Sequence, residues 1–338
     1  MRAVMSASEN FIVEGAASGA DLQLTADGRL RHLLTLQGLS RDRISALLDR
    51  ATAFLSPPGA RAVRSQALVG MTVANLFFEP STRTRASFDL AAKRLGADVL
   101  NLDVNTSSRK KGESILDTMY TLQAMQVDVF VVRDASAGVP AYIARHVDSH
   151  VSILNAGESH ISHPTQGLLD MLTIRRHKGS FENLVVAIVG DIAHSRVARS
   201  AAEGLTTMGV GELRLVSPPA LAPDPETMPA CRILDNLDEG LRDADVVMAL
   251  RIQRERIGSL DGIPGIDEYF ANFGITAERM KIARPDAIVM HPGPMNRGIE
   301  IESALADSPH SVIAEQVTNG VAIRMAVLET VAATLAGQ

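Results

Sequence analysis

Short apolar runs alternate with stretches of helical periodicity from about residue 30 to the end of the chain. Runs of about six apolar residues bounded by turn residues are typical of parallel strands that are buried on both faces of a sheet. Strands that alternate with helices predict right-handed βαβ crossovers and open sheets. The predicted strands lie at 71–78, 98–103, 127–134, 151–156, 184–191, 212–218, 245–250 and 286–293.

A long helical stretch and a polar joint at 165–183 interrupt this alternation, and the strand–helix pattern then restarts. We therefore predict an α/β protein of two domains, each an open parallel sheet flanked by helices, with long helices linking them. Residues 1–30 are small and polar, so we expect a partly ordered N-terminal arm. The predicted domains are 31–170 and 171–311, with a C-terminal helix at 312–336 packing back onto the first.

The composition is that of an ordinary soluble globular protein, with 46 % apolar and 21 % charged residues. The net charge of −6 gives no electrostatic case for binding nucleic acid or a membrane, so any basic site must be local. The single cysteine, Cys231, excludes an intrachain disulfide and leaves no Cys/His metal spacing. Because this spacing is missing, we expect no metal. We expect a cytoplasmic protein, because a single cysteine fits a reducing compartment and residues 1–30 lack the apolar core of a signal peptide.

Cationic, hydroxyl and amide side chains follow nearly every predicted strand. In open parallel sheets, ligands bind beyond the carboxyl ends of the strands. Polar segments at these ends in both halves therefore predict one cleft between the two domains. The segments are EPSTRTR (79–85), SSRKKGE (107–113), Arg133, SHISHPTQ (159–166), IAHSR (192–196), RIQRER (251–256) and HPGPMNRG (291–298).

The PSTRTR segment stands where a buried strand gives way to a helix. Free backbone N–H groups and the positive end of the helix dipole favour an anion there. Hydroxyl donors and an arginine fork, which holds two phosphate oxygens at once, add to this. The alternative is a Ser/Thr N-cap followed by solvated arginines. Two arginines in a first helical turn oppose the dipole unless an anion offsets them, which favours a phosphate site.

The stretches FEPSTRTRASF, SSRKKGE and HPTQG, in that order, resemble the carbamoyltransferase family. RIQRER and HPGPMNRG are similar to its aspartate branch, whose members make N-carbamoyl-L-aspartate for pyrimidine (UMP) biosynthesis. The likeness runs from about residue 30 to 335. It implies carbamoyl phosphate and L-aspartate as substrates, and no cofactor.

The resemblance also implies roles for single residues in binding carbamoyl phosphate. Arg133 matches an arginine that touches both phosphate and carbonyl oxygen, and His163 and Gln166 match contacts to the carbamoyl group. We expect a neutral His163, because nearby arginines disfavour its protonation; a structural turn histidine is the alternative. Arg83, Thr84, Arg133 and His163 are expected to stabilise the transition state. The full predicted set is Ser81, Thr82, Arg83, Thr84, Arg133, His163, Gln166, Gly293 and Pro294.

For aspartate, the resemblance points to Lys111, Arg196, Arg251 and Gln253. A dicarboxylate suits two guanidinium forks, although Arg251 alone is equally read as a surface charge. Ser107 and Lys111 lie in a polar loop that is either simply solvated or, as in the family, reaches the active site of a neighbouring subunit. The second reading implies a homotrimer with shared active sites.

Two other functions are possible. Ornithine carbamoyltransferases share the phosphate half, but the resemblance gives them an SMG loop and an HCLP-like turn, which this chain lacks. A non-catalytic scaffold or nucleotide-binding subunit is the other reading, although VVAIVGDIAHSR lacks the GxGxxG spacing. The N-terminal extension and the HPGP-x-NRG turn resemble a group that assembles with dihydroorotase, or a dihydroorotase-like chain, into larger dodecameric particles.

Overall fold

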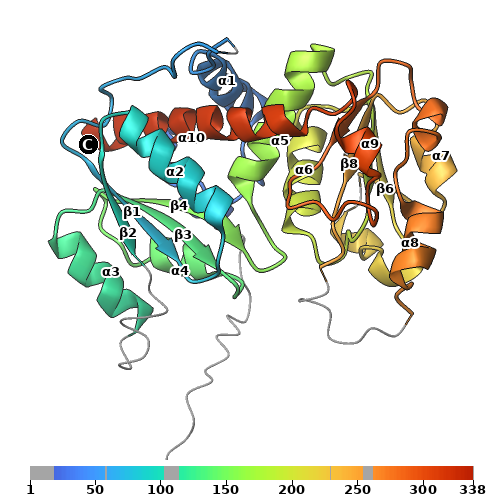
Figure 1. Cartoon of the computed structure of the whole chain (residues 1–338). Helices are drawn as coiled ribbons and strands as arrows, with labels where there is room; N and C mark the ends of the chain where they lie inside the picture. The colour runs from blue at the N-terminus through green and yellow to red at the C-terminus, as the bar shows by residue number, and fades with distance from the viewer. Residues whose placement is uncertain (1–18, 58, 103–113, 229, 254–261, 338) are drawn as a thin grey trace, which may run out of the picture.

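The computed structural model describes residues 19–57, 59–102, 114–228, 230–253 and 262–337. It contains two domains, each built on one parallel sheet with helices on both faces (Figure 1). The predicted α/β class is therefore confirmed. Ser107, Lys111 and most of the predicted N-terminal arm lie outside the described residues.

The two sheets are wholly parallel. The first has the order β2-β1-β3-β4 and the second the order β7-β6-β5-β8-β9. In each sheet the first strand of the domain in sequence, β1 or β5, lies in the interior, and the later strands are added on both sides of it, as in doubly wound sheets. The strands are β1 Thr72–Phe77, β2 Asp98–Leu102, β3 Val129–Asp134, β4 Ser152–Glu158, β5 Val185–Val189, β6 Glu212–Val216, β7 Arg232–Leu234, β8 Val246–Ala249 and β9 Ile288–Met290.

Most helices begin at a residue that suits a helix start. Ser114, for example, forms a capping box with Asp117, in which each side chain accepts a hydrogen bond from the other residue's backbone N–H. The helices are α1 Arg41–Thr52, α2 Thr82–Arg94, α3 Ile115–Ala124, α4 Val139–Ala144, α5 Pro164–Lys178, α6 Arg196–Thr207, α7 Leu237–Leu241, α8 Ile266–Phe273, α9 Ser303–Ala306 and α10 Ile313–Ala336. Short 3-10 turns occur at Ala20–Leu22, Pro219–Leu221, Pro225–Thr227 and Arg279–Ile282.

Strand β2 differs from its prediction. It forms where expected, but it lies at the edge of the sheet and is not buried on both faces. Leu100, at its centre, is 37 % exposed. The run of apolar residues predicts a strand, but its place in the sheet depends on which neighbours cover it.

Helix α10 runs back across the first domain and packs against α1, α2 and α5 (Figure 1). It is long and apolar enough to cross a membrane by those two measures alone, yet most of it is buried inside the protein. A buried core helix passes the same test, and the packing identifies α10 as one.

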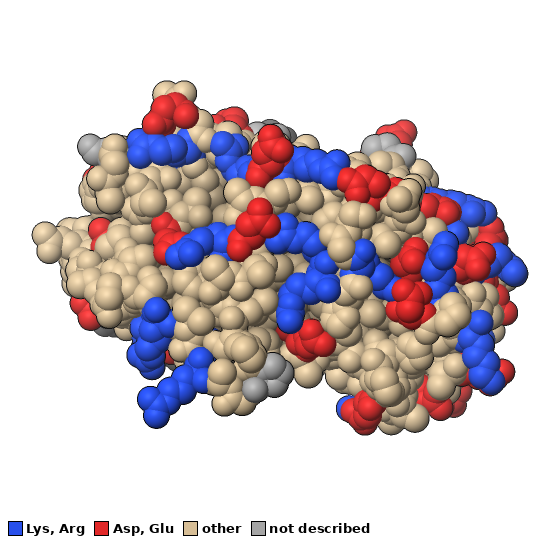
Figure 2. All heavy atoms as spheres, turned by 90° about the horizontal axis from the view of Figure 1, so that it is seen from above, with Lys and Arg blue, Asp and Glu red and all other residues tan. Residues whose placement is uncertain are grey.

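One hydrophobic core continues through both domains. It joins the inner faces of the two sheets to α1, α2, α5, α6 and α10, while two smaller cores cover the outer faces. On the surface, basic and acidic side chains are interspersed and form no single basic face in the view of Figure 2. The shared core places the carboxyl ends of both sheets around one cleft.

Candidate active site

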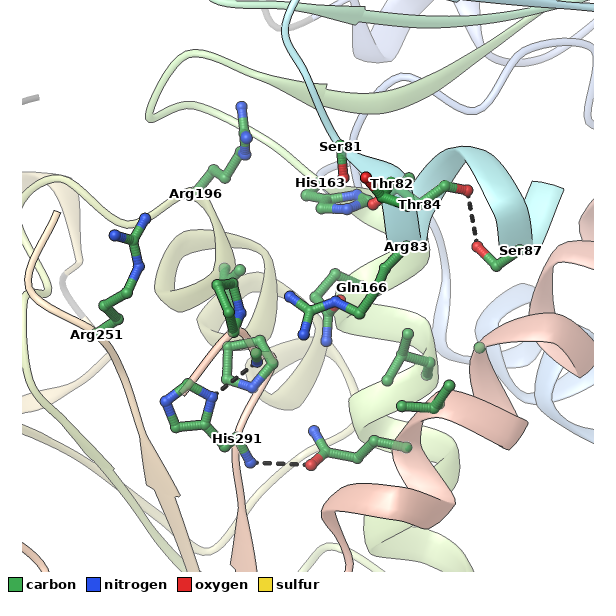
Figure 3. Close-up of a pocket in the computed structure, with 18 of the residues that line it drawn as sticks. Ser81, Thr82, Arg83, Thr84, Ser87, His163, Gln166, Arg196, Arg251 and His291 are labelled. Carbon is green, nitrogen blue, oxygen red and sulfur yellow. Dashed lines mark hydrogen bonds between the residues drawn. The ribbon is translucent and has the colours of Figure 1, made fainter. Parts of the chain in front are cut away.

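A cavity of about 590 Å³ lies between the two domains, where the central strands of both sheets end. It is walled by the first turns of α2, α5 and α6, the segments that follow β8 and β9, and the start of α10. Every predicted site residue within the described ranges lines it, and Figure 3 labels most of them. They are Ser81, Thr82, Arg83, Thr84, Arg133, His163, Gln166, Arg196, Arg251, Gln253, Gly293 and Pro294.

The start of α2 forms the phosphate-like side of the cavity. Ser81 occupies the N-cap position, yet within the described part of the chain its hydroxyl makes no capping hydrogen bond. The N-cap alternative therefore does not account for Ser81. Thr84 is buried in the first turn of the helix, and Arg83 extends toward the opposite wall (Figure 3). Backbone N–H groups, hydroxyls and a guanidinium converge here as an anion site requires.

Arg83 of the first domain faces Arg251 of the second across the cavity (Figure 3). Partial burial lowers the pKa of Arg83, and the positive charge of Arg251 lowers it further. Two like charges that approach from separate domains repel each other unless an anion lies between them. The geometry is therefore suited to a ligand of negative charge.

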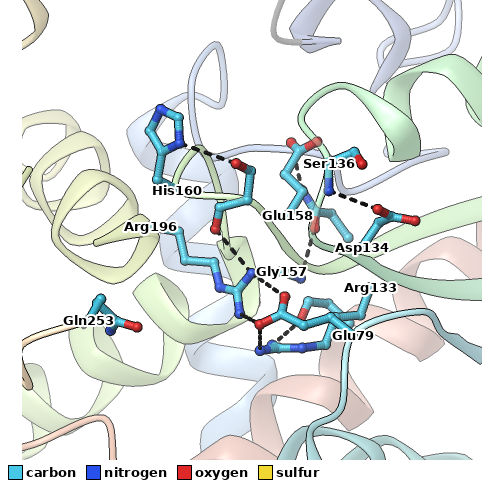
Figure 4. A network of polar contacts seen from close by, with 12 residues as sticks. Glu79, Arg133, Asp134, Ser136, Gly157, Glu158, His160, Arg196 and Gln253 are labelled. Atoms are coloured by element: carbon cyan, nitrogen blue, oxygen red, sulfur yellow. Dashed lines mark hydrogen bonds and ion pairs between the residues drawn. The ribbon is translucent and has the colours of Figure 1, made fainter. Parts of the chain in front are cut away.

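A second pair of arginines already holds a carboxylate. Arg133, at the end of β3, donates from Nη2 to Glu79 Oε1 at 3.1 Å. Arg196, the first residue of α6, donates from Nη1 to Glu79 Oε2 at 2.8 Å and from Nη2 to Oε1 at 2.9 Å (Figure 4). Glu79 and Arg133 belong to the first domain and Arg196 to the second, so this carboxylate bridges the two domains.

Gly157 makes room for these two arginines. A Cβ atom on residue 157 would lie 2.8 Å from Arg133 Nη1 and 3.1 Å from Arg196 Nε. The backbone there has φ +117°, which side chains rarely adopt. Arg133 Nη1 also donates to the Ala156 carbonyl at 3.0 Å. The end of β4 thus fixes where both guanidinium groups lie.

The second domain presents Arg251 and Gln253 from the segment after β8. The backbone N–H of Gln253 donates to Asp191 Oδ2 at 2.9 Å, and Asp191 follows β5. Arg251 Nη2 donates to Gln253 Oε1 at 3.3 Å. Asp191 is fully buried, so it anchors this segment to the sheet. The result is a guanidinium and an amide held side by side on the second-domain wall.

His163 and Gln166 project from the start of α5. His163 is buried, and its backbone N–H donates to Ser200 Oγ of α6 at 2.9 Å. Gln166 lies in the first turn of the helix, and its Nε2 donates to Asp170 Oδ1 at 3.0 Å. This wall therefore offers an imidazole and an oriented amide to the cavity.

The sequence indicated no role for His291 beyond that of a loop residue, but the structure buries it in the cavity wall. Its Nδ1 accepts a hydrogen bond from the Gly293 N–H at 2.7 Å, so the proton of a neutral ring is on Nε2. Nε2 then donates to Glu300 Oε1 at 3.1 Å. The Gly293–Pro294 peptide bond is cis. His291 and Glu300 together shape the loop that the sequence placed in the site.

Three further residues of the wall were given no individual role from the sequence. Glu79 directly precedes the PSTRTR segment, and its position at a strand end was a usable signal. Gln316 and Arg324 lie on α10, a mostly apolar helix that the sequence indicated only as a packing element. Polar residues within an otherwise apolar helix were the signal there. Across the described ranges, no group of three or more His, Cys, Asp or Glu side chains is placed to hold a metal ion.

Comparison with known proteins assigns a family to each domain. Residues 31–176 match the model described as "Aspartate/ornithine carbamoyltransferase, carbamoyl-P binding domain". Residues 182–331 match the model described as "Aspartate/ornithine carbamoyltransferase, Asp/Orn binding domain". The two matches together span most of the chain.

Solved structures similar to the chain come from both branches of that family. Aspartate transcarbamoylase from Trypanosoma cruzi in complex with carbamoyl phosphate and aspartate is 31 % identical, with a TM-score of 0.80. The match covers 92 % of this chain and 99 % of that one. Ornithine carbamoyltransferase from Thermus thermophilus is 26 % identical, with a TM-score of 0.78 over 89 % of this chain and 98 % of that one. The likeness therefore extends to proteins with two different amine substrates.

Proposed function

The chain belongs to the aspartate/ornithine carbamoyltransferase family, and from this premise we propose that its amine substrate is L-aspartate. The reaction transfers the carbamoyl group of carbamoyl phosphate to the aspartate amine and gives N-carbamoyl-L-aspartate and phosphate. This is a step of de novo pyrimidine biosynthesis.

The observation that carries the proposal is the cationic second-domain wall. Arg196 and Arg251 line the cavity from that domain, with Gln253 beside them. Two guanidinium groups suit the two carboxylates of aspartate, one of which would share Arg196 with Glu79 or replace Glu79 there. They repel the side-chain ammonium of ornithine, so the same wall selects against the rival substrate. The Trypanosoma cruzi protein, crystallised with aspartate, supports this choice.

The chemistry that we propose needs no acyl-enzyme. The aspartate amine attacks the carbamoyl carbon, a C–N bond forms, and the bond from carbon to the phosphate oxygen breaks. Arg133, Thr84 and His163 stabilise the negative charge on the carbonyl oxygen. The leaving phosphate stays with Ser81, Thr82 and Arg83 and accepts the proton that the amine loses. Gln166 and the Gly293–Pro294 loop contact the carbamoyl amide.

Most of the rate enhancement would come from positioning. Carbamoyl phosphate and aspartate are both anions and repel each other in water. Arg83 and Arg133 of the first domain and Arg196 and Arg251 of the second offset that repulsion and hold the reacting atoms together. Closure of the two domains over the bound pair would exclude water from the site.

The deciding experiment assays the purified chain with carbamoyl phosphate and either L-aspartate or L-ornithine. We expect carbamoylation of aspartate and none of ornithine. Carbamoylation of ornithine alone would contradict the proposal, and turnover of neither amine, even with added partner chains, would favour the scaffold reading.

We further propose a homotrimer in which Ser107 and Lys111 complete the active site of the neighbouring subunit. The segment that carries them joins β2 to α3. Beside it, β2 is an edge strand with Leu100 exposed, and Leu90 of α2 is 45 % exposed. Exposed apolar side chains at a sheet edge suit a subunit contact.

Complementation tests the shared site. Lys111→Ala and Arg133→Ala variants should each be inactive, and mixed trimers should regain activity because some sites then contain neither substitution. No recovery on mixing, with mixed trimers shown by mass spectrometry, would contradict the shared site.

A dihydroorotase or a dihydroorotase-like chain is proposed as a partner in a larger dodecameric assembly, with residues 1–30 needed for it. Size-exclusion chromatography with the partner should give a large particle for the full chain and none for a chain lacking residues 1–18. An equal particle size for both chains would contradict the role of the arm.

A further inference from the structure

A buried carboxylate stands behind Gln166. Asp170 lies one helical turn further along α5 and is only 1 % exposed. Its Oδ1 accepts one hydrogen bond from Gln166 Nε2 at 3.0 Å and another from Gln316 Nε2 at 2.8 Å. Gln316 lies on α10, so Asp170 connects two helices that both line the cavity.

The chain of hydrogen bonds continues to the opposite wall. Gln316 Oε1 accepts from the backbone N–H of His291 at 2.9 Å (Figure 3). His291 Nδ1 in turn accepts from the Gly293 N–H. A continuous polar path therefore runs from Gln166, through Asp170 and Gln316, to the loop at 291–294.

Asp170 determines the orientation of the side-chain amides of Gln166 and Gln316. A carboxylate oxygen with lone pairs accepts hydrogen bonds, so each glutamine must direct its –NH2 group toward Asp170. The carbonyl oxygen of Gln166 is then left for the cavity, as an acceptor. An amide turned the other way would present a donor to the cavity and would place two acceptors against each other inside the protein.

The hydrogen bonds to Asp170 and the positive charge of the buried Arg324 offset only part of the cost of burying this carboxylate. Burial raises the pKa of Asp170 to about 7, against the hydrogen bonds from Gln316 and Gln166 and the charge of Arg324. Its second oxygen, Oδ2, has no hydrogen-bond partner among the described residues. A buried charge with an unsatisfied oxygen is costly, and an apolar residue of similar size is often as stable or more so. A proton on Oδ2 leaves Oδ1 an acceptor, so the amide orientation holds in both forms.

We propose that Asp170 is a positioning residue that turns the Gln166 carbonyl toward the ligand and, through Gln316, holds the 291–294 loop, so that the site selects a ligand with an –NH2 group beside its phosphate. This rests on the proposed function, in which that ligand is carbamoyl phosphate. Acetyl phosphate has the same shape with a methyl group in place of –NH2. A site built around a hydrogen bond discriminates strongly against the analogue that lacks it.

The test measures the dissociation constants of carbamoyl phosphate, acetyl phosphate and inorganic phosphate by calorimetry, without any amine present. In Asp170→Leu, we expect the preference for carbamoyl over acetyl phosphate to fall by about tenfold or more. Binding of inorganic phosphate should change by less than about twofold, because its contacts are untouched. Asp170→Asn keeps an acceptor oxygen and should keep most of the preference.

Thr173→Val is the matched control. Thr173 lies one turn further along α5 and accepts from Asn319 Nδ2 of α10 at 2.8 Å, but it does not reach the cavity. This variant loses a buried hydrogen bond between the same two helices and should bind all three ligands as the native chain does. If it lost the preference as Asp170→Leu does, the effect of Asp170 would be one of helix packing and the proposal would be wrong.

A double-mutant cycle checks the route. Since Asp170 acts in part through Gln166, the free energy of preference lost in the Asp170→Leu, Gln166→Leu double variant should be smaller than the sum of the losses in the two single variants. Should Asp170→Leu fail to fold, Gln316→Met keeps the carboxylate, breaks the link to His291 and should lower the same preference severalfold. An unchanged preference in either single variant would overturn the proposal.

These outcomes are separate from the identity of the amine. A native chain that prefers carbamoyl phosphate but does not carbamoylate aspartate contradicts the proposed function and leaves the role of Asp170 standing. A native chain that binds carbamoyl and acetyl phosphate equally contradicts the role of Asp170, whatever amine it uses.

Discussion

Gly293 of the second domain lies directly against Arg83 of the first. A Cβ atom on residue 293 would overlap the Arg83 guanidinium, at 2.7 Å from Cζ. Arg83 passes through the space that any other side chain at this position would fill. Because Gly293 has no side chain, the Arg83 guanidinium of the first domain can extend to the second.

We predict that Gly293→Ala lowers kcat/KM for carbamoyl phosphate by about ten- to a hundredfold, because Arg83 must move out of its position. Gly298→Ala is the control, since Gly298 has a similar backbone, φ +80° against +66°, with no described atom within 4 Å. Both substitutions bear the same backbone strain of about 1 kcal/mol, so both should lower the stability slightly. Equal activity of the two variants in steady-state assays would show that Arg83 tolerates displacement.

Glu79→Ala is expected to weaken domain closure. The substitution leaves Arg133 and Arg196 facing each other without the carboxylate that joins them. Removing one partner of a fully buried ion pair costs about 3–5 kcal/mol, and the cost here should be smaller because Glu79 is partly exposed. We expect a rise of at least about tenfold in KM for aspartate, and small-angle scattering should show a more open pair of domains. An unchanged KM would mean that Glu79 does not hold the domains together during turnover.

Arg83→Ala is expected to leave the fold intact and to lower kcat/KM by about a thousandfold or more, because the phosphate loses a bidentate charged contact. Arg85→Ala is the control. Arg85 lies in the same first turn of α2, is exposed, and does not line the cavity. Circular dichroism should show native melting for both variants. Near-native rates for Arg83→Ala would refute the assignment of the phosphate site.

The sequence predicted the elements that rest on strong local patterns. Eight of the apolar runs form strands, because a continuous run of that length has few other stable structures. The residues at the strand ends meet in one cavity for a topological reason, since parallel strands direct all their carboxyl ends to one edge. Short β7 and the small helix α7 carry too few residues for a visible period, and they were not predicted.

What the sequence did not indicate are contacts between distant segments. The Glu79–Arg196 pair joins residues 117 positions apart, and the Asp170–Gln316 pair joins residues 146 apart. No local pattern specifies such partners, because they depend on how the domains and α10 pack. The prediction that β2 is buried on both faces was wrong for the same reason, since the burial of a strand depends on the order of the strands in the sheet.

The last prediction concerns Glu158, at the end of β4. Burial raises its pKa to about 7, and hydrogen bonds from the Gly138 N–H and the Asn155 side chain oppose the shift. The folded state therefore holds the proton more tightly than the unfolded chain, whose glutamate titrates near 4.3. The stabilising contribution is fully present below about pH 4 and is lost as the pH rises to about 7.

Glu158→Gln removes this titration and should flatten the pH dependence of stability. The free energy of unfolding of the native chain should fall by about 3 kcal/mol relative to the variant between pH 4.5 and 7.5. The –NH2 group of the glutamine would face one of the two donors that now bind Glu158, the Gly138 N–H or the Asn155 side chain. This lowers the stability of the variant by a constant amount at every pH and does not change the slope of stability against pH. His32, whose pKa burial lowers to about 3, and Asp170 titrate in both proteins and cancel in the difference. Urea denaturation across this range checks the slope, and parallel curves would show that Glu158 titrates normally.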